Sequence, residues 1–209
     1  MREMFITIEG IDGCGKSTQA VLLKKAVEET GVKVLLTREP GGSSIGELIR
    51  NALLTKVMSN TTEFLLFAAD RNEHIEGLIL PALQSGTIVI SDRFTDSSVA
   101  YQGYGRGVDI DFIKSVHNFI TKGLYPDLTI LIDVPPEISF ERRKVTSLDR
   151  IEKEGVSFLK TVRDGYIKIA SEEKERFAIV DGRESLNIVS ERIFRIFVER
   201  REKWKNRKS

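Results

Sequence analysis

A glycine-rich segment carries the residue types that hold phosphates. It follows an apolar run, Met4–Ile8, and reads Gly10-Ile11-Asp12-Gly13-Cys14-Gly15-Lys16-Ser17-Thr18. Glycines let successive backbone N–H groups turn inward, the lysine reaches the β- and γ-phosphates, and the serine hydroxyl can ligate Mg²⁺ where a helix begins. The segment therefore predicts a P-loop that binds a nucleoside triphosphate.

Cations and an aromatic residue recur near the ends of other apolar runs. Arg38 opens the turn Arg38-Glu39-Pro40-Gly41-Gly42, and Arg93 follows Asp92 after a third run. On a helical stretch between them, Phe67 and Arg71 are four residues apart and share a face. An aromatic face can stack on a base while a guanidinium bonds its edge, and paired arginines can clamp a phosphate. Together they predict a nucleotide acceptor facing the donor.

Each of these residues also has a simpler interpretation. A Phe in an apolar helical run usually packs into the core, and an Arg beside an Asp can be a local ion pair. Their joint placement after the strands of a parallel sheet, where ligands gather, favours the nucleotide site.

Apolar runs alternate with longer stretches of helical periodicity, which is typical of a parallel α/β sheet covered on both faces. We expect one domain over residues 1–209. The predicted strands are Phe5–Ile8, Lys33–Thr37, Thr87–Ser91, Leu128–Asp133 and Phe177–Val180. The predicted helices are Lys16–Thr30, Ile45–Leu54, Thr61–Leu83, Ile110–Gly123, Val156–Lys174 and Leu186–Lys203, with loops at Pro40–Gly42 and Gly103–Gly107.

Composition argues against polymer or membrane partners. Lys and Arg total 32 against 31 Asp and Glu, so no net field favours nucleic acid or an anionic membrane. No run approaches the length of a spanning helix and no cleavage-site pattern follows the first apolar run, so we expect a cytoplasmic protein. The single cysteine, Cys14, excludes an intramolecular disulfide and is interpreted as a small residue filling the loop.

The motifs together resemble the bacterial-type thymidylate kinases. The resemblance runs nearly end to end, through Ile8-Glu9-Gly10, Arg38-Glu39-Pro40-Gly41-Gly42, Phe67-Ala68-Ala69-Asp70-Arg71, Asp92-Arg93-Phe94, Ala100-Tyr101-Gln102 and Leu148-Asp149-Arg150-Ile151-Glu152. It implies a P-loop nucleoside monophosphate kinase fold and transfer of the γ-phosphoryl group of Mg-ATP to dTMP. It also implies a homodimer paired through helices.

The resemblance further implies roles for single residues. Phe67 would stack on thymine and Arg71 would bond its edge, while Arg38 and Arg93 would hold the dTMP phosphate. Asp12 would lie near the sugar hydroxyl and, with Ser17, near Mg²⁺. Ser97, Ser98 and Tyr101 would line the deoxyribose pocket, Lys16 would act on the transferring group, and the Arg93–Phe94 peptide would be cis.

A short basic lid is expected at about 140–152. Some family members carry an arginine inside the P-loop at the position of Gly13, and this chain does not. The lid would bring cations to the transferring phosphoryl group instead, and its candidates are Arg142, Arg143, Lys144 and Arg150. A solvated basic turn is the simpler interpretation.

Other functions find less support. A guanine-reading Asn-Lys-x-Asp is absent, and no Asp is followed by Glu as in motor and transporter ATPases. A kinase of another nucleoside or nucleoside monophosphate remains the alternative. His74 and His117 lie on helical stretches away from the motifs, so we expect surface or structural roles, and we interpret the basic tail from Arg200 to Lys208 as a charged helix end.

Overall fold

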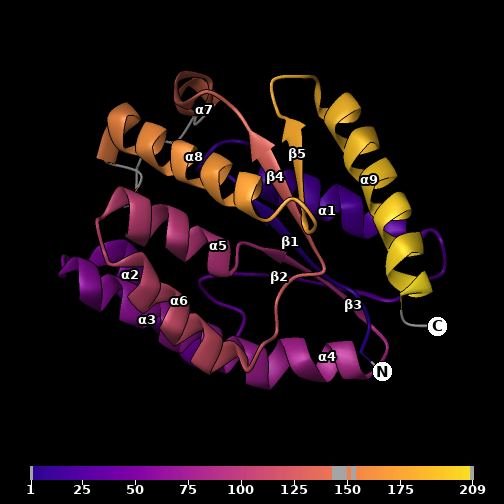
Figure 1. Ribbon diagram of the computed structural model, residues 1–209, viewed down its shortest axis with the longest axis horizontal. Helices are drawn as coiled ribbons and strands as arrows, with labels where there is room; N and C mark the ends of the chain where they lie inside the picture. The colour runs from indigo at the N-terminus through magenta and orange to yellow at the C-terminus, as the bar shows by residue number, and fades with distance from the viewer. Residues whose placement is uncertain (1, 143–149, 152–153, 208–209) are drawn as a thin grey trace.

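A computed structural model describes residues 2–142, 150–151 and 154–207, and a single parallel sheet organises them (Figure 1). Its strands are β1 (Phe5–Glu9), β2 (Val34–Arg38), β3 (Ile88–Asp92), β4 (Leu128–Asp133) and β5 (Phe177–Asp181). They are ordered β2-β3-β1-β4-β5 and every neighbouring pair is parallel. The five-stranded α/β sheet predicted from the sequence is confirmed.

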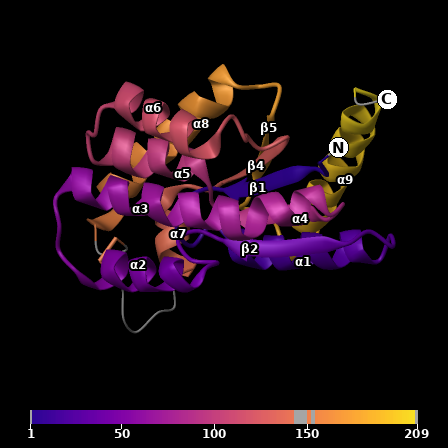
Figure 2. The same ribbon diagram turned by 90° about the horizontal axis from the view of Figure 1, so that it is seen from below.

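Helices cover both faces of the sheet (Figures 1 and 2). On one face α1 (Lys16–Glu28) packs on β2 and β3, and α9 (Leu186–Asn206) packs on β4, β5 and α1. On the other face lie α4 (Leu80–Gln84), α5 (Thr95–Ser98) and α8 (Gly155–Glu172). The remaining helices are α2 (Ser44–Thr55), α3 (Asn60–His74), α6 (Ile110–Thr121) and α7 (Pro136–Arg142).

Burial explains why the central strands read as continuous apolar runs. Every residue of β1 is buried, as are Ile88, Val89 and Ile90 of β3. The register pairs Ile8 with Asp92 and Glu9 with Leu131, so the carboxyl ends of β1, β3 and β4 lie side by side. The loops that follow these strands therefore meet at one edge of the sheet, where ligands of such folds bind.

The helices differ from the prediction in several places, and neither α5 nor α7 was predicted. The expected helix 61–83 is interrupted by a π-helical segment, Ile75–Ile79, between α3 and α4. The expected loop 103–107 begins inside a second π-helical segment, Val99–Gly105. Its glycines serve close packing, because a Cβ at Gly105 would lie 2.8 Å from the Phe158 ring.

Among the described residues no helix is long and apolar enough to cross a membrane.

Candidate functional site

The P-loop lies between β1 and α1, as the sequence predicts. Gly13 and Gly15 have φ of +82° and +101°, values that L side chains rarely adopt. Lys16 opens α1 and is buried, and its Nζ donates to the Ile11 carbonyl at 3.0 Å and approaches the Cys14 sulfur at 3.9 Å. Burial raises the pKa of the Cys14 thiol, so the residue behaves as a small apolar filler. The loop backbone is thus shaped to surround a phosphate.

Ser17 and Asp92 form the oxygen pair best suited to a divalent cation. The Ser17 hydroxyl donates to Asp92 Oδ2 at 2.5 Å, and the buried Oδ1 of Asp92 has no partner among the described residues. Hydroxyl and carboxylate oxygens are the ligands that Mg²⁺ takes in P-loop proteins. Asp12, the other predicted metal ligand, faces a different cavity from Ser17.

Arg93 is the centre of a polar cluster at the carboxyl edge of the sheet. Its Nη2 is paired with Asp12 Oδ1, and its Nη1 donates to the hydroxyl of Ser97 at 3.0 Å. The Tyr101 hydroxyl donates to Asp12 Oδ2 at 2.8 Å. Although burial opposes it, the charges of Arg93 and Lys16 lower the pKa of Asp12 to about 2. Asp12 is therefore a fixed anion that orients Arg93.

The backbone at Arg93 is strained. Its φ is +75°, a conformation that costs a non-glycine residue roughly 1–3 kcal/mol and concentrates at functional sites. The expected cis peptide at Arg93–Phe94 is wrong: among the described residues the cis bond is Glu39–Pro40. A cis bond costs far less before proline than before phenylalanine.

A cavity opens beside this cluster, and most of the predicted acceptor residues line it. Phe67, Arg93, Ser97, Ser98 and Tyr101 all contribute to its walls. The remaining lining includes Asp12, Glu39, Pro40, Arg50, Leu54, Gln102 and Ile151. We call it the acceptor cavity. Its volume of about 110 Å³ is below the range of about 300–1,000 Å³ typical of ligand pockets, so a whole nucleotide requires its walls to move outward.

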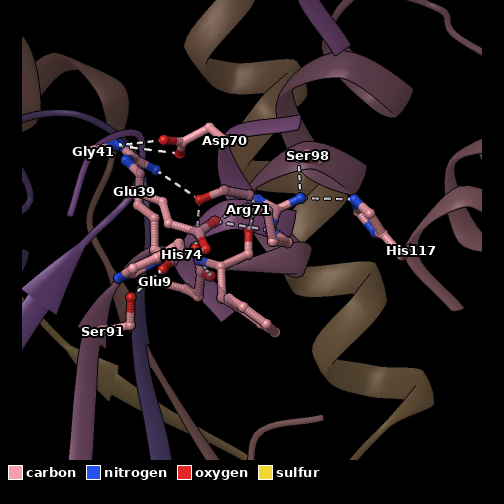
Figure 3. A network of polar contacts seen from close by, with 12 residues as sticks. Glu9, Glu39, Gly41, Asp70, Arg71, His74, Ser91, Ser98 and His117 are labelled. Carbon is pink, nitrogen blue, oxygen red and sulfur yellow. Dashed lines mark hydrogen bonds and ion pairs between the residues drawn. The ribbon is translucent and has the colours of Figure 1, made fainter. Parts of the chain in front are cut away.

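Arg71 is not among the residues that line this cavity, but it bonds two that are, Glu39 and Ser98 (Figure 3). The side chain is 1% exposed, and its five N–H donors are all used. Nε and Nη2 pair with Glu39, Nη1 donates to Ser98 Oγ at 3.1 Å and to His117 Nε2 at 2.8 Å, and Nη2 donates to the Phe94 carbonyl. One guanidinium thus links α3, α5 and α6 with the loops that follow β2 and β3.

Glu39 is the counter-charge at the heart of this network, which we call the Arg71 network. One oxygen accepts from Arg71 and the other lies 3.1 Å from His74 Nδ1, whose Nε2 is 2.7 Å from Thr37 Oγ1. Asp70 accepts from the Gly41 backbone N–H at 3.0 Å, and burial together with the charge of Glu39 raises its pKa to about 7. His74 and His117 have structural roles, as expected. Both are buried within the Arg71 network beside the acceptor cavity, however, and do not lie away from the site.

Arg38 and the described lid cations lie elsewhere. Arg38 is exposed and pairs with Glu47 of α2 at 3.1 Å, in the same cavity as Ser17 and Asp92. Arg142 ends α7 and donates to the Gly182 carbonyl at 2.8 Å, whereas Arg150 is paired with Glu63 and bonds the Leu53 carbonyl. Arg143 and Lys144 fall outside the described residues.

Sequence reasoning missed three residues of the site. The sequence suggests only an ion pair with Arg93 for Asp92, although an Asp closing a strand beside a P-loop serine is the usual metal arrangement. Arg50 lines the acceptor cavity and donates to the Pro40 carbonyl at 2.9 Å. Glu39 belongs to a quoted motif but received no role of its own, since an acid before proline usually marks an exposed turn.

Comparisons with known proteins all find relatives of one family. The family model described as "Thymidylate kinase" matches residues 8–193. A relative named "Thymidylate kinase" from Fervidobacterium nodosum is 46% identical over 93% of this chain and 98% of its own length. One of that name from Geotalea daltonii is 49% identical over 85% of this chain and 88% of its own. The crystal structure of thymidylate kinase from Ehrlichia chaffeensis superposes with a TM-score of 0.77 at 37% identity, covering 93% of this chain and 98% of that one.

Proposed function

The chain belongs to the thymidylate kinase family, and from that premise we propose how its residues divide the work of the reaction. The enzyme phosphorylates dTMP to dTDP with ATP as the phosphoryl donor. The observation that carries the residue assignments is the acceptor cavity, which places Phe67, Arg93 and Tyr101 around one space beside the P-loop.

On the acceptor side, Phe67 stacks on thymine and Arg93 holds the dTMP phosphate with Arg38. Phe67 is half-buried on the wall of the acceptor cavity, so one ring face is available to a base. Asp12 and Tyr101 fix Arg93, and with Ser97 and Ser98 they line the sugar side. To bond the edge of the base, Arg71 exchanges one of its present partners for the thymine oxygen.

On the donor side, the P-loop backbone and Lys16 bind the triphosphate of ATP. Lys16 exchanges its bond to the Ile11 carbonyl for phosphate oxygens. Ser17 and Asp92 would hold Mg²⁺, which would neutralise phosphate charge. Asp12 contributes through its charge, because its carboxylate already accepts from Arg93 and Tyr101.

The dTMP oxygen attacks the γ-phosphorus directly, so the protein contributes position and charge rather than a nucleophile. Cations of the lid at about 140–152 complete the positive environment. The bond from Arg142, at the end of α7, to the carbonyl of Gly182, the residue after β5 at the carboxyl edge of the sheet, supports this role for Arg142.

An apolar face on α3 and α6 supports a homodimer. Leu65 of α3 is 46% exposed, and Phe119 and Phe112 of α6 are 83% and 41% exposed. These two helices pack against each other, with Phe64 and Phe112 in edge-to-face contact at 5.7 Å. A second copy of this chain would cover the face, and Phe119→Asp should shift sedimentation toward monomer.

We also propose that the reaction takes place in the cytoplasm. Cys14 is a free thiol, as is usual in a reducing compartment, and the substrates ATP and dTMP imply no nucleic-acid or membrane partner.

A screen of acceptors with ATP tests the proposed assignments most simply. We expect rapid turnover of dTMP, slower turnover of dUMP, which lacks the 5-methyl contact, and very slow turnover of dCMP, whose amino group would face Arg71. Equal rates with dCMP or AMP would show that the cavity does not read thymine. Phe67→Ala should raise KM for dTMP and leave KM for ATP nearly unchanged, with Ile188→Ala at an exposed position of α9 as the control.

A further inference from the structure

A second cavity shares His117 with the Arg71 network and shares no lining residue with the acceptor cavity. Its volume is about 390 Å³, within the range of small-molecule sites. Val99, Tyr104, Ile110, Tyr125 and Ile169 supply apolar and aromatic walls from the second π-helical segment, α6, the loop before β4 and α8. We call it the rear cavity, and nothing in the phosphoryl transfer uses it.

His117 connects the rear cavity to the Arg71 network. It lines the rear cavity, and its Nε2 contacts Arg71 Nη1 at 2.8 Å (Figure 3). An arginine can only donate, so Nε2 is the acceptor and the ring proton must sit on Nδ1. Burial and the charge of Arg71, which lower the pKa of His117 to about 2, keep this neutral form at all ordinary pH. The tautomer of His117 is therefore fixed by its neighbour.

The Nδ1–H group of His117 is a donor available to a ligand. Among the described residues no group accepts a hydrogen bond from Nδ1. Nδ1 is also not one of the fully buried polar atoms that lack a partner, so it retains access to solvent. The space that His117 lines is the rear cavity. A molecule there with a hydrogen-bond acceptor would satisfy this donor.

The charges around the rear cavity do not select a strongly charged ligand. Arg176 is held by Asp96 in a two-bond pair at 2.7 Å and also bonds Glu173. Lys114 and Glu172, at the exposed rim, have opposite signs. The walls thus offer two tyrosine rings, aliphatic side chains and one fixed donor, which suits a planar, uncharged heterocycle.

We propose that the rear cavity binds a small neutral heterocycle whose acceptor bonds His117 Nδ1–H, and that its occupancy is coupled to dTMP binding through the His117–Arg71 bond. A hydrogen bond at Nδ1 polarises the imidazole and strengthens Nε2 as an acceptor. The stronger bond to His117 then holds Arg71 Nη1 beside Ser98, a wall residue of the acceptor cavity, while the second N–H of Nη1 exchanges Ser98 for the thymine oxygen. The heterocycle should therefore tighten dTMP binding, and this coupling rests on the proposed dTMP assignment.

The test uses the whole protein, labelled with ¹⁵N-histidine, saturated with dTMP and titrated with nicotinamide. The chain has only two histidines, so their ring signals serve as probe and internal control. We expect a saturable shift of His117 Nδ1 with His74 unchanged, because His74 is 0% exposed and bonded to Glu39 and Thr37. No saturable shift with nicotinamide or 2-pyridone up to their solubility limits, or a shift seen only without dTMP, overturns the site.

Variants and calorimetry complete the test. Ile110→Trp should fill the rear cavity and abolish the shift, whereas Val198→Trp, at an exposed position of α9, should keep it. Saturating nicotinamide should lower the Kd for dTMP about fivefold, and dTMP should lower the Kd for nicotinamide by the same factor. A saturable site with no change in dTMP affinity overturns the coupling. If the thymidylate assignments are wrong, the acceptor screen shows it independently of this test. The shift of His117 in the wild-type protein does not depend on turnover.

Discussion

The cations on the two sides of the site are held in different ways. On the acceptor side, Arg71 pairs with Glu39 at 2.7 Å and Arg93 pairs with Asp12. On the donor side, Lys16 is bonded to the Ile11 carbonyl and Arg142 to the Gly182 carbonyl. Among the described residues no carboxylate lies within ion-pair distance of either donor-side cation.

This difference separates orientation from charge stabilisation. A carboxylate fixes the geometry of an arginine but cancels much of its charge, whereas a carbonyl holds a cation and leaves the charge available. The acceptor side should therefore control which nucleotide binds and how it is aimed. The donor side should control how fast the phosphoryl group moves.

The largest effect should come from Lys16→Ala. It should lower kcat by roughly a thousandfold, as expected for loss of a preorganised charge-stabilising donor, while thermal unfolding stays close to that of the wild type. ADP release assays and circular dichroism measure both. Lys25→Ala, at an exposed position of the same helix, is the control, and a folded Lys16→Ala enzyme with normal kcat would remove Lys16 from the mechanism.

Glu39→Gln should damage stability, since it leaves the buried Arg71 without its counter-charge. Breaking a buried pair from one side costs about 3 kcal/mol, which urea unfolding should show directly. Glu47→Gln breaks the exposed pair with Arg38 and should cost less than about 1 kcal/mol. Equal losses for the two variants would contradict the structural role of Glu39.

Among the lid cations, at least one of Arg142→Ala, Arg143→Ala and Lys144→Ala should lower kcat by roughly a hundredfold with little change in dTMP affinity. The contact forms fully only as the charge develops, so ground-state binding barely registers it. Normal turnover in all three variants and in the triple variant, at saturating substrates, would mean that the lid carries no catalytic cation.

The smallest effect concerns pH and the buried Glu9, which accepts from the Phe94 N–H and the hydroxyls of Ser97 and Tyr166. Burial, with a smaller contribution from Asp96, raises the pKa of Glu9 from 4.5 to about 7. The folded state thus holds an extra proton between these values, so the free energy of unfolding should fall as pH rises through 7.

Urea unfolding from pH 5 to 8 should show this slope, and Glu9→Gln should reduce it to the part that Asp70 contributes. The exposed Glu28→Gln is the control. An unchanged slope in Glu9→Gln would show that Glu9 does not carry the proton.

The sequence was sufficient for the strands and the P-loop, because buried parallel strands and phosphate loops have strong local signals. It could not place Arg71, whose partners Glu39, Ser98 and His117 come from distant segments. Spacing put Arg71 on the same helical face as Phe67, yet only three-dimensional packing shows that it does not line the acceptor cavity. Gly103 and Gly105 likewise suggested a loop, because a glycine needed for close helix packing looks the same in the sequence as a glycine in a loop.

The most direct test of the division between the two sides is dTMP binding without ATP, measured by calorimetry on Lys16→Ala and Phe67→Ala. Lys16→Ala should bind dTMP with the Kd of the wild type while its turnover is lost, and Phe67→Ala should bind dTMP weakly. A Lys16→Ala protein that loses dTMP affinity as much as Phe67→Ala would contradict it.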